Sequence, residues 1–73
     1  MLISPIANPK LIKRPMVESL TTMSRSRIYA LMSTGDFPKP VTIGAMSVAW
    51  IESEVVSWIE AKIALRNPPK VGA

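Results

Sequence analysis

Arginine and serine alternate at positions 24 to 27, and both side-chain types bind DNA in proteins. A guanidinium group can pair with two acceptors of guanine in the major groove or bind a phosphate, and a serine hydroxyl can contact either. A phenol follows one turn later, and residues 25–33 contain no carboxylate. The candidate base-reading residues are Arg25, Ser26 and Arg27, and the candidate phosphate contacts in this segment are Ser24 and Tyr29.

Two further polar residues complete the candidate set. Lys39 lies between Pro38 and Pro40 in a rigid segment, where it could meet the DNA backbone, and Ser47 follows an uncharged turn. Each assignment has an alternative: Arg25, Arg27 and Lys39 could form a solvated surface. In the same way, Tyr29 could pack its ring and expose only its hydroxyl. Composition and spacing leave both interpretations open.

Composition argues against enzyme chemistry. The chain of 73 residues has no cysteine and no histidine, and only five carboxylate side chains. Disulfides are thereby excluded, and so are the commonest zinc ligands and the commonest general base. We therefore expect no catalytic residue, no metal site, no cofactor and no small-molecule substrate.

Charge favours a nucleic-acid partner. The net charge is +4 and the isoelectric point is about 10, so double-stranded DNA is the first partner to consider and an anionic membrane surface the second. The longest uncharged stretch, 40–51, is too short for a membrane span, which needs about 20 apolar residues. The first ten residues do not resemble a signal peptide. We expect a cytoplasmic, nucleoid-associated protein of bacterial type with no membrane contact.

The candidate residues need a scaffold, and the sequence predicts one folded unit over 11–66. Residues 1–10 are expected to form a flexible arm and residues 67–73 a flexible tail. An extended segment at 11–14 precedes a helix that should begin at Pro15 and end near Thr21, because proline is favoured in the first helical turn.

A second helix is predicted from the N-cap Ser24 to about Thr34, with Gly35 as the residue that ends it. Only about three residues separate it from the first helix. If Ile28, Leu31 and Met32 face inward, the arginines and serines lie on the outer and flanking faces.

The second half of the domain is predicted to be a hairpin followed by a helix. Val41 and Ile43 alternate with polar or small residues, residues 44–47 form a turn, and the alternation resumes through Trp50, which gives the hairpin one apolar face. A third helix should begin between residues 52 and 54 and end near residue 66. Its predicted apolar stripe is Val55, Trp58, Ile59 and Ile63, and we place Trp58 against the hairpin. Two short helices, a tight turn and a hairpin indicate a winged helix-turn-helix, mainly α with a small β-hairpin.

Several of these segments together resemble the AlpA family of prophage regulators. The resemblance is carried by SRSRIY at 24–29, GDFPKPV at 35–41, VAW at 48–50 and ESEV at 52–55 followed by Trp58, and it covers about residues 13–62. It implies a winged helix related to the excisionases and to the DNA-binding domain of MerR-type regulators. It also implies a transcription factor of bacterial or phage origin that regulates prophage genes.

Two positions depart from the family pattern. Thr22 stands in the turn where the family usually has glycine, so a positive φ there would carry a cost. The tip of the predicted wing, residues 44–47, lacks the basic residue that the family often carries. A charged wing in the minor groove is therefore not expected, although Ser47 and backbone amides could still meet phosphate.

The combined interpretation is a sequence-specific regulator that reads the major groove with its second helix, at about 24–34. It needs no cofactor and could form a cooperative homo-oligomer on DNA. One alternative is an excisionase, a recombination directionality factor that bends attachment-site DNA through the same contacts. An alternative from another class is a protein–protein interaction module without DNA binding, which would use the wing and the end of the third helix.

Overall fold

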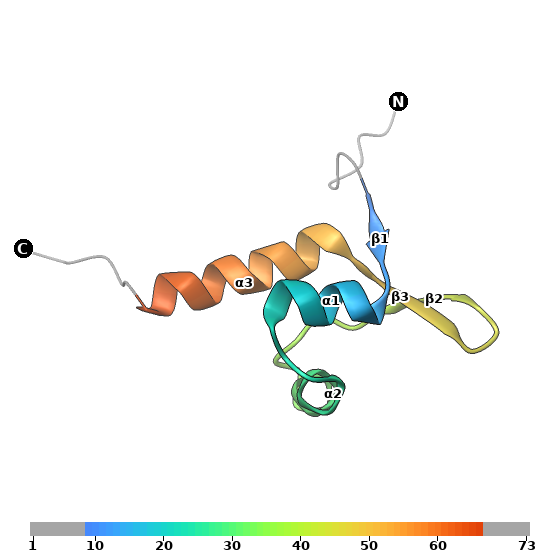
Figure 1. Cartoon of the computed structure of the whole chain (residues 1–73), viewed down its shortest axis with the longest axis horizontal. Coiled ribbons are helices and arrows are strands. Elements are labelled where there is room, and N and C mark those ends of the chain that lie inside the picture. The colour runs from blue at the N-terminus through green and yellow to red at the C-terminus, as the bar shows by residue number, and fades with distance from the viewer. Residues whose placement is uncertain (1–8, 67–73) are drawn as a thin grey trace, which may run out of the picture.

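The computed structural model describes residues 9–66, which form three helices and a three-stranded antiparallel sheet (Figure 1). The elements in chain order are β1 (Leu11–Ile12), α1 (Arg14–Thr21), α2 (Arg25–Ser33), β2 (Val41–Gly44), β3 (Ser47–Ile51) and α3 (Glu52–Arg66). The fold is mainly helical with a small hairpin, which confirms the predicted fold class. Most of the predicted arm, residues 1–8, and the whole predicted tail, residues 67–73, lie outside the described residues.

The first two helices are joined by a short left-handed turn. α1 begins at Arg14, one residue before the predicted start, and Pro15 occupies its first turn. Thr22 adopts a φ of 61°, and its backbone N–H donates to the carbonyl of Glu18. The chain thus keeps the backbone geometry that suits glycine while carrying a β-branched residue, which the sequence had left open.

Both ends of α2 follow the predicted capping residues. The Ser24 hydroxyl accepts a hydrogen bond from the backbone N–H of Arg27 at 3.2 Å. At the other end Gly35 has a φ of 80°. The N–H of Gly35 donates to the carbonyl of Met32, and that of Asp36 donates to Leu31, which is the Schellman pattern of a helix end. Local chemistry therefore fixes the length of α2.

β3 is the central strand of the sheet. β1 pairs with it so that Leu11 lies opposite Ile51, and β2 pairs with its other edge so that Val41 lies opposite Ala49. The pairing of β2 and β3 is irregular between Thr42 and Gly44, just before the turn. The sheet ties the predicted extended segment at the start of the domain to the hairpin.

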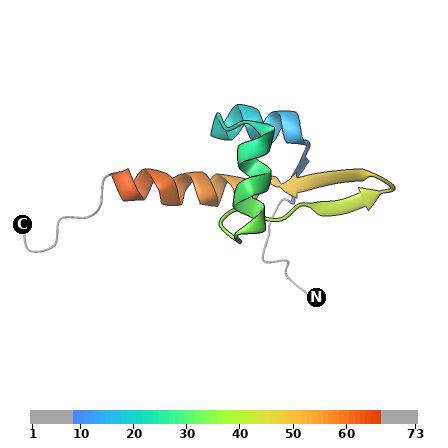
Figure 2. The ribbon, with the colours of Figure 1, turned by 90° about the horizontal axis from the view of Figure 1, so that it is seen from below.

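The predicted apolar face of the hairpin is only half correct. On β3, Trp50 is buried as predicted, but Ala49, which the alternation places on the other face, is buried as well. On β2 both Val41 and Ile43 are exposed, the latter by 49%. The reason is visible in Figures 1 and 2, where the hairpin projects beyond the helices and leaves β2 without a helix over it. β2 therefore belongs to the projecting wing and contributes little to the core.

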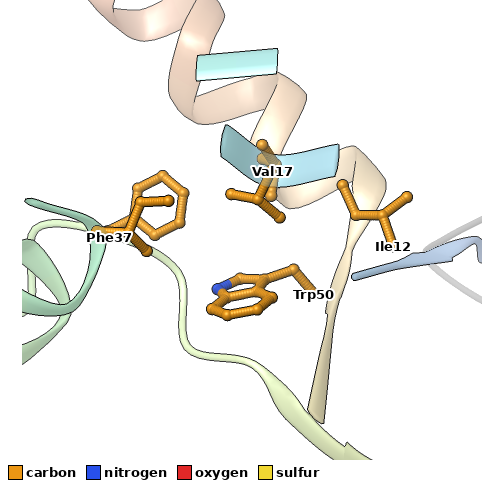
Figure 3. Close-up of a cluster of buried hydrophobic side chains, with 6 residues drawn as sticks. Ile12, Val17, Phe37 and Trp50 are labelled. Carbon is orange, nitrogen blue, oxygen red and sulfur yellow. The ribbon is translucent and has the colours of Figure 1, made fainter. Parts of the chain in front are cut away.

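A cluster of six apolar residues forms the core around the Trp50 indole. Its members are Ile12, Val17, Ile28, Phe37, Trp50 and Val55, and each is at most 5% exposed. Figure 3 shows side chains from β1, α1 and the segment after α2 around that indole. Its N–H donates to the carbonyl of Pro38 at 3.0 Å, so the buried polar atom is satisfied. The predicted core position of Trp50 is confirmed.

α3 departs from the sequence interpretation at two positions. Trp58 meets Phe37 edge to face at 5.0 Å between ring centroids, and its indole N–H donates to the Asp36 carbonyl. Its specific contacts are thus with the segment between α2 and β2 instead of the hairpin strands against which we placed it. Ile63 is 50% exposed, so it does not belong to the buried stripe, because α3 runs on past the end of α1 (Figure 1). None of the helices in residues 9–66 is both long and apolar enough to cross a membrane.

Candidate nucleic-acid interface

α2 presents an exposed basic first turn on one side of the molecule. Figure 2 shows this helix crossing the line formed by the hairpin and α3, with α1 at one end. Ile28 anchors it in the core with no exposed surface, while Arg25, Ser26 and Arg27 are exposed. The period of the helix therefore separates one buried side from a polar one, as the sequence predicted.

An edge-to-face pair of aromatic rings connects this surface to the core. The Tyr29 ring lies 6.4 Å from the Trp50 ring between centroids, at an interplanar angle of 79°. The guanidinium carbon of Arg25 lies 5.7 Å from the centroid of the same Tyr29 ring, within the range of a cation–π contact. Tyr29 is 38% exposed, so it packs and also reaches the surface. Both roles that the sequence left open are compatible with this position.

A groove lies between the first turn of α2, the start of α1 and the turn end of the hairpin. We call it the wing groove; its volume is about 460 Å³, and it is lined by Lys13, Arg14, Pro15, Arg25, Tyr29, Met46, Ser47 and Val48. The groove brings together Arg25, Tyr29 and Ser47, which the sequence had nominated from two separate segments. It contains three cationic residues and no carboxylate among its lining residues, so its charge favours an anion.

Two of the three cationic side chains of the wing groove form hydrogen bonds to other side chains. The Lys13 ammonium donates to the Ser47 hydroxyl at 2.8 Å, which links the start of α1 to the start of β3. Arg14 instead donates through Nε to the Glu18 carboxylate at 2.8 Å, one turn along α1. Part of the Arg14 charge is thereby offset within the helix, whereas Lys13 has a neutral partner.

A second groove lies on the other side of Tyr29. We call it the corner groove; its volume is about 490 Å³, and it is lined by Tyr29, Met32, Ser33, Lys39 and Pro40. Lys39 is exposed here, beside the C-terminal half of α2, and again no carboxylate is among the lining residues. Tyr29 lines both grooves. Of the other predicted residues, Arg25 and Ser47 line the first groove, and Lys39 lines the second.

The remaining predicted residues lie outside these two grooves. Ser24, Ser26 and Arg27 line neither of them and lie in or next to the exposed first turn of α2. The Ser24 hydroxyl already accepts the capping hydrogen bond and keeps its own O–H free to donate. Glu52 and Glu54 lie elsewhere, in the first turn of α3. Across residues 9–66 no three acidic side chains come close enough together to hold a metal ion.

Comparison with known proteins shows the family of this chain. Residues 10–63 match the family described as Prophage CP4-57 regulatory protein (AlpA). The chain belongs to the AlpA family. An E. coli K12 relative described as DNA-binding transcriptional activator AlpA is 31% identical over 62 residues, covering 77% of this chain and 89% of the relative. A relative from Enterobacteria phage P4, described as Uncharacterized protein ORF88, is 40% identical over 62 residues, covering 85% of this chain and 70% of the relative.

Sequence reasoning missed two residues of this AlpA-family surface. Lys13 and Arg14 were assigned only to an extended segment before the first helix, yet both line the wing groove. The signal available in the sequence was a pair of adjacent cations before Pro15. Their relation to Ser47 depends on the pairing of β1 with β3, which brings residues far apart in the chain together.

Proposed function

We propose that this protein is a sequence-specific, double-stranded-DNA-binding transcriptional regulator of the prophage type. Membership of the AlpA family supports this proposal, as does the similarity to a relative whose name states DNA binding and transcriptional activation. The observation that carries it is the arrangement of α2, an exposed basic helix turn flanked by two grooves that contain cations and no carboxylates.

In the proposed complex α2 enters the major groove. Arg25, Ser26 and Arg27 read base edges, because they occupy the exposed first turn and carry the donors that bases accept. The backbone contacts come from Ser24, Tyr29, Lys39 and Ser47. Tyr29 lies between the two grooves, so the phosphates on either side of α2 would be contacted from opposite sides of the same ring.

This function requires no catalytic residue and no cofactor, and it takes place in the bacterial cytoplasm at the nucleoid. One helix turn reads only a few base pairs. We therefore propose that useful specificity comes from repeated or paired sites, occupied by more than one copy of the chain.

Selection of bound sequences from random duplex DNA is the direct test. We expect an enriched motif, and on that motif the affinity should depend on salt with a log–log slope of about −4 to −5, as for about five neutralised phosphates. Selection without enrichment, together with an affinity for duplex DNA that salt does not change, would contradict the proposal and favour the protein-interaction alternative.

A second measurement separates the regulator from an excisionase. An excisionase bends its DNA and binds inside an attachment site, whereas a regulator binds at a promoter. Circular-permutation gel shifts on the selected motif measure the bend angle, and the genomic position of that motif relative to an integrase gene supplies the second criterion. Little bending at a promoter site supports the regulator.

A further inference from the structure

The hydrogen bond between Lys13 and Ser47 joins two segments that are 34 positions apart in the chain. Lys13 directly precedes α1, and Ser47 is the first residue of β3, directly after the turn of the wing. Both line the wing groove, and Arg25 lines it as well. The segment before α1, the helix α2 and the strand β3 thus place donors on a single concave surface beside α2.

We propose that Lys13, held by the Ser47 hydroxyl, binds a phosphate of the DNA backbone in the wing groove, next to Arg25. This assignment rests on the proposed function and adds a phosphate site that the first turn of α2 does not supply. Its ligand class is a phosphodiester of duplex DNA, bound without regard to base sequence.

The donor chemistry fits an anion that accepts several hydrogen bonds. An ammonium group has more N–H donors than the one that Ser47 uses, and a serine hydroxyl that accepts from Lys13 can still donate its own hydrogen. Neither of the ion pairs formed within residues 9–66 involves Lys13. Its charge is therefore available to a ligand, while the bond to Ser47 restricts where the ammonium group lies.

The neighbouring arginine is a poorer candidate for this site. Arg14 lines the same groove, but its guanidinium is paired with Glu18 in the same helix. A phosphate approaching Arg14 would meet that carboxylate as well. Lys13 is the cation of α1's N-terminal end whose charge no carboxylate offsets.

This site also accounts for a wing without charge. Ala45 and Met46 form the turn of the hairpin, and neither can neutralise a phosphate. Lys13 places a cation beside Ser47, directly after that turn, from a distant part of the chain. The positive charge that the wing itself lacks is then supplied from the junction of β1 and α1.

The experiment measures the salt dependence of binding to the selected duplex and to an unrelated duplex for the parent, Lys13→Ala and Lys13→Gln. Losing one phosphate contact should make the log–log slope less steep by about 0.9 and weaken binding to both duplexes by the same factor. The two variants share the loss of charge, but the glutamine retains a donor for Ser47. Circular dichroism and thermal melting confirm that each variant is folded.

Lys62→Ala is the matched control. Lys62 is also a lysine on the surface, but it lies over the Trp58 ring and lines a separate groove with Leu20 and Ile63. We expect the parental slope for this variant. An equal loss of slope in Lys62→Ala and Lys13→Ala would mean that overall charge is measured, and it would overturn the site.

A double variant in which the two residues are exchanged, the swap variant, tests the pairing of Lys13 with Ser47. Lys13→Ser combined with Ser47→Lys returns an ammonium group and a hydroxyl to the same two positions, so the slope should recover towards that of the parent. A parental slope for Lys13→Ala, or a swap variant no better than Lys13→Ala, overturns the inference and leaves the proposed function standing. A parent that binds neither duplex overturns the proposed function itself.

Discussion

The guanidinium carbon of Arg25 lies 5.7 Å from the centroid of the Tyr29 ring, which meets the buried indole of Trp50 edge to face. Trp50 is fully buried and its N–H is fixed by the Pro38 carbonyl. The Tyr29 ring is thus held in place by the core, and its contact with Arg25 restricts the position of that guanidinium group on the surface. A long side chain that is already restricted loses less conformational entropy when it binds a ligand.

This relationship predicts different effects for two substitutions of Tyr29. Tyr29→Phe keeps the ring under Arg25 and loses only the hydroxyl with its proposed phosphate contact, so it should weaken specific DNA binding by less than Tyr29→Ala does. Tyr29→Ala removes the ring, and we expect it to weaken binding by about 1 kcal/mol through the freed Arg25. Fluorescence anisotropy titrations at fixed salt measure both variants. Equal losses for the two would instead assign the contribution to the phenol hydroxyl.

Arg27 is predicted to read a base. It is exposed in the first turn of α2, and only its backbone N–H contributes to the cap of that helix. Arg27→Ala should weaken binding to the selected duplex by about 1 to 3 kcal/mol and relax the preference at one position of the motif. The melting temperature should stay close to that of the parent. Unchanged affinity at fixed salt would remove Arg27 from the interface.

Substitutions of Trp58 measure how much its contacts with the segment after α2 contribute to the free energy of unfolding. Trp58→Ala deletes the ring that meets Phe37, and we expect a loss of about 3 kcal/mol of unfolding free energy, a large part of the stability of so small a domain. Trp58→Phe retains an aromatic ring and loses the hydrogen bond to the Asp36 carbonyl, which should cost about 1 kcal/mol. Urea denaturation measures both. A variant that melts like the parent but no longer binds DNA would identify Trp58 as a contact residue.

Thr22 offers a substitution that should stabilise the protein. Its φ of 61° is a left-handed conformation that costs a residue with a Cβ about 1 to 2 kcal/mol. Thr22→Gly removes that cost but gains freedom in the unfolded chain, so we expect a net stabilisation of about 0.5 to 1 kcal/mol. Thr34→Gly is the control, because Thr34 has a φ of −95° and should be destabilised by glycine. Chemical denaturation of both variants should give shifts of opposite sign.

Local chemistry explains what the sequence could predict. Ser24, Gly35 and Pro15 act on their own neighbours, so the start of α1 and both ends of α2 follow from them within one residue. The identity of the core is less local. Phe37 lies in an irregular segment with no periodicity to nominate it, yet it is 3% exposed because α3 and Trp58 cover it.

The exposed residues that were predicted to be buried share one cause. The spacing of Ile43 and Ile63 is that of a buried face, but burial also needs a partner element over that face. The hairpin and α3 each project past α1, so both side chains remain about half exposed. The same dependence on tertiary arrangement hid Lys13, whose partner Ser47 is close only because β1 pairs with β3.

The tip of the wing gives the last prediction, because it is exposed and uncharged. Met46 is fully exposed in the hairpin turn with a φ of 57°, and Ala45 beside it is exposed as well. If the wing follows the DNA backbone, Ala45→Arg adds a cation beside a phosphate. The log–log salt slope should then steepen by about one unit, and binding to all duplexes should tighten alike.

Ala45→Gln is the control for this variant, since it adds a side chain of similar reach without charge and should keep the parental slope. Single-site duplexes and duplexes with several adjacent sites are titrated in parallel. A parental slope on single sites for Ala45→Arg, combined with loss of cooperativity on adjacent sites, would mean that the tip meets a neighbouring copy of the chain. In that case Met46 and Ile43, both exposed, become the apolar side chains of a contact between protein copies, and the phosphate contacts of the wing end at Ser47, beside that turn.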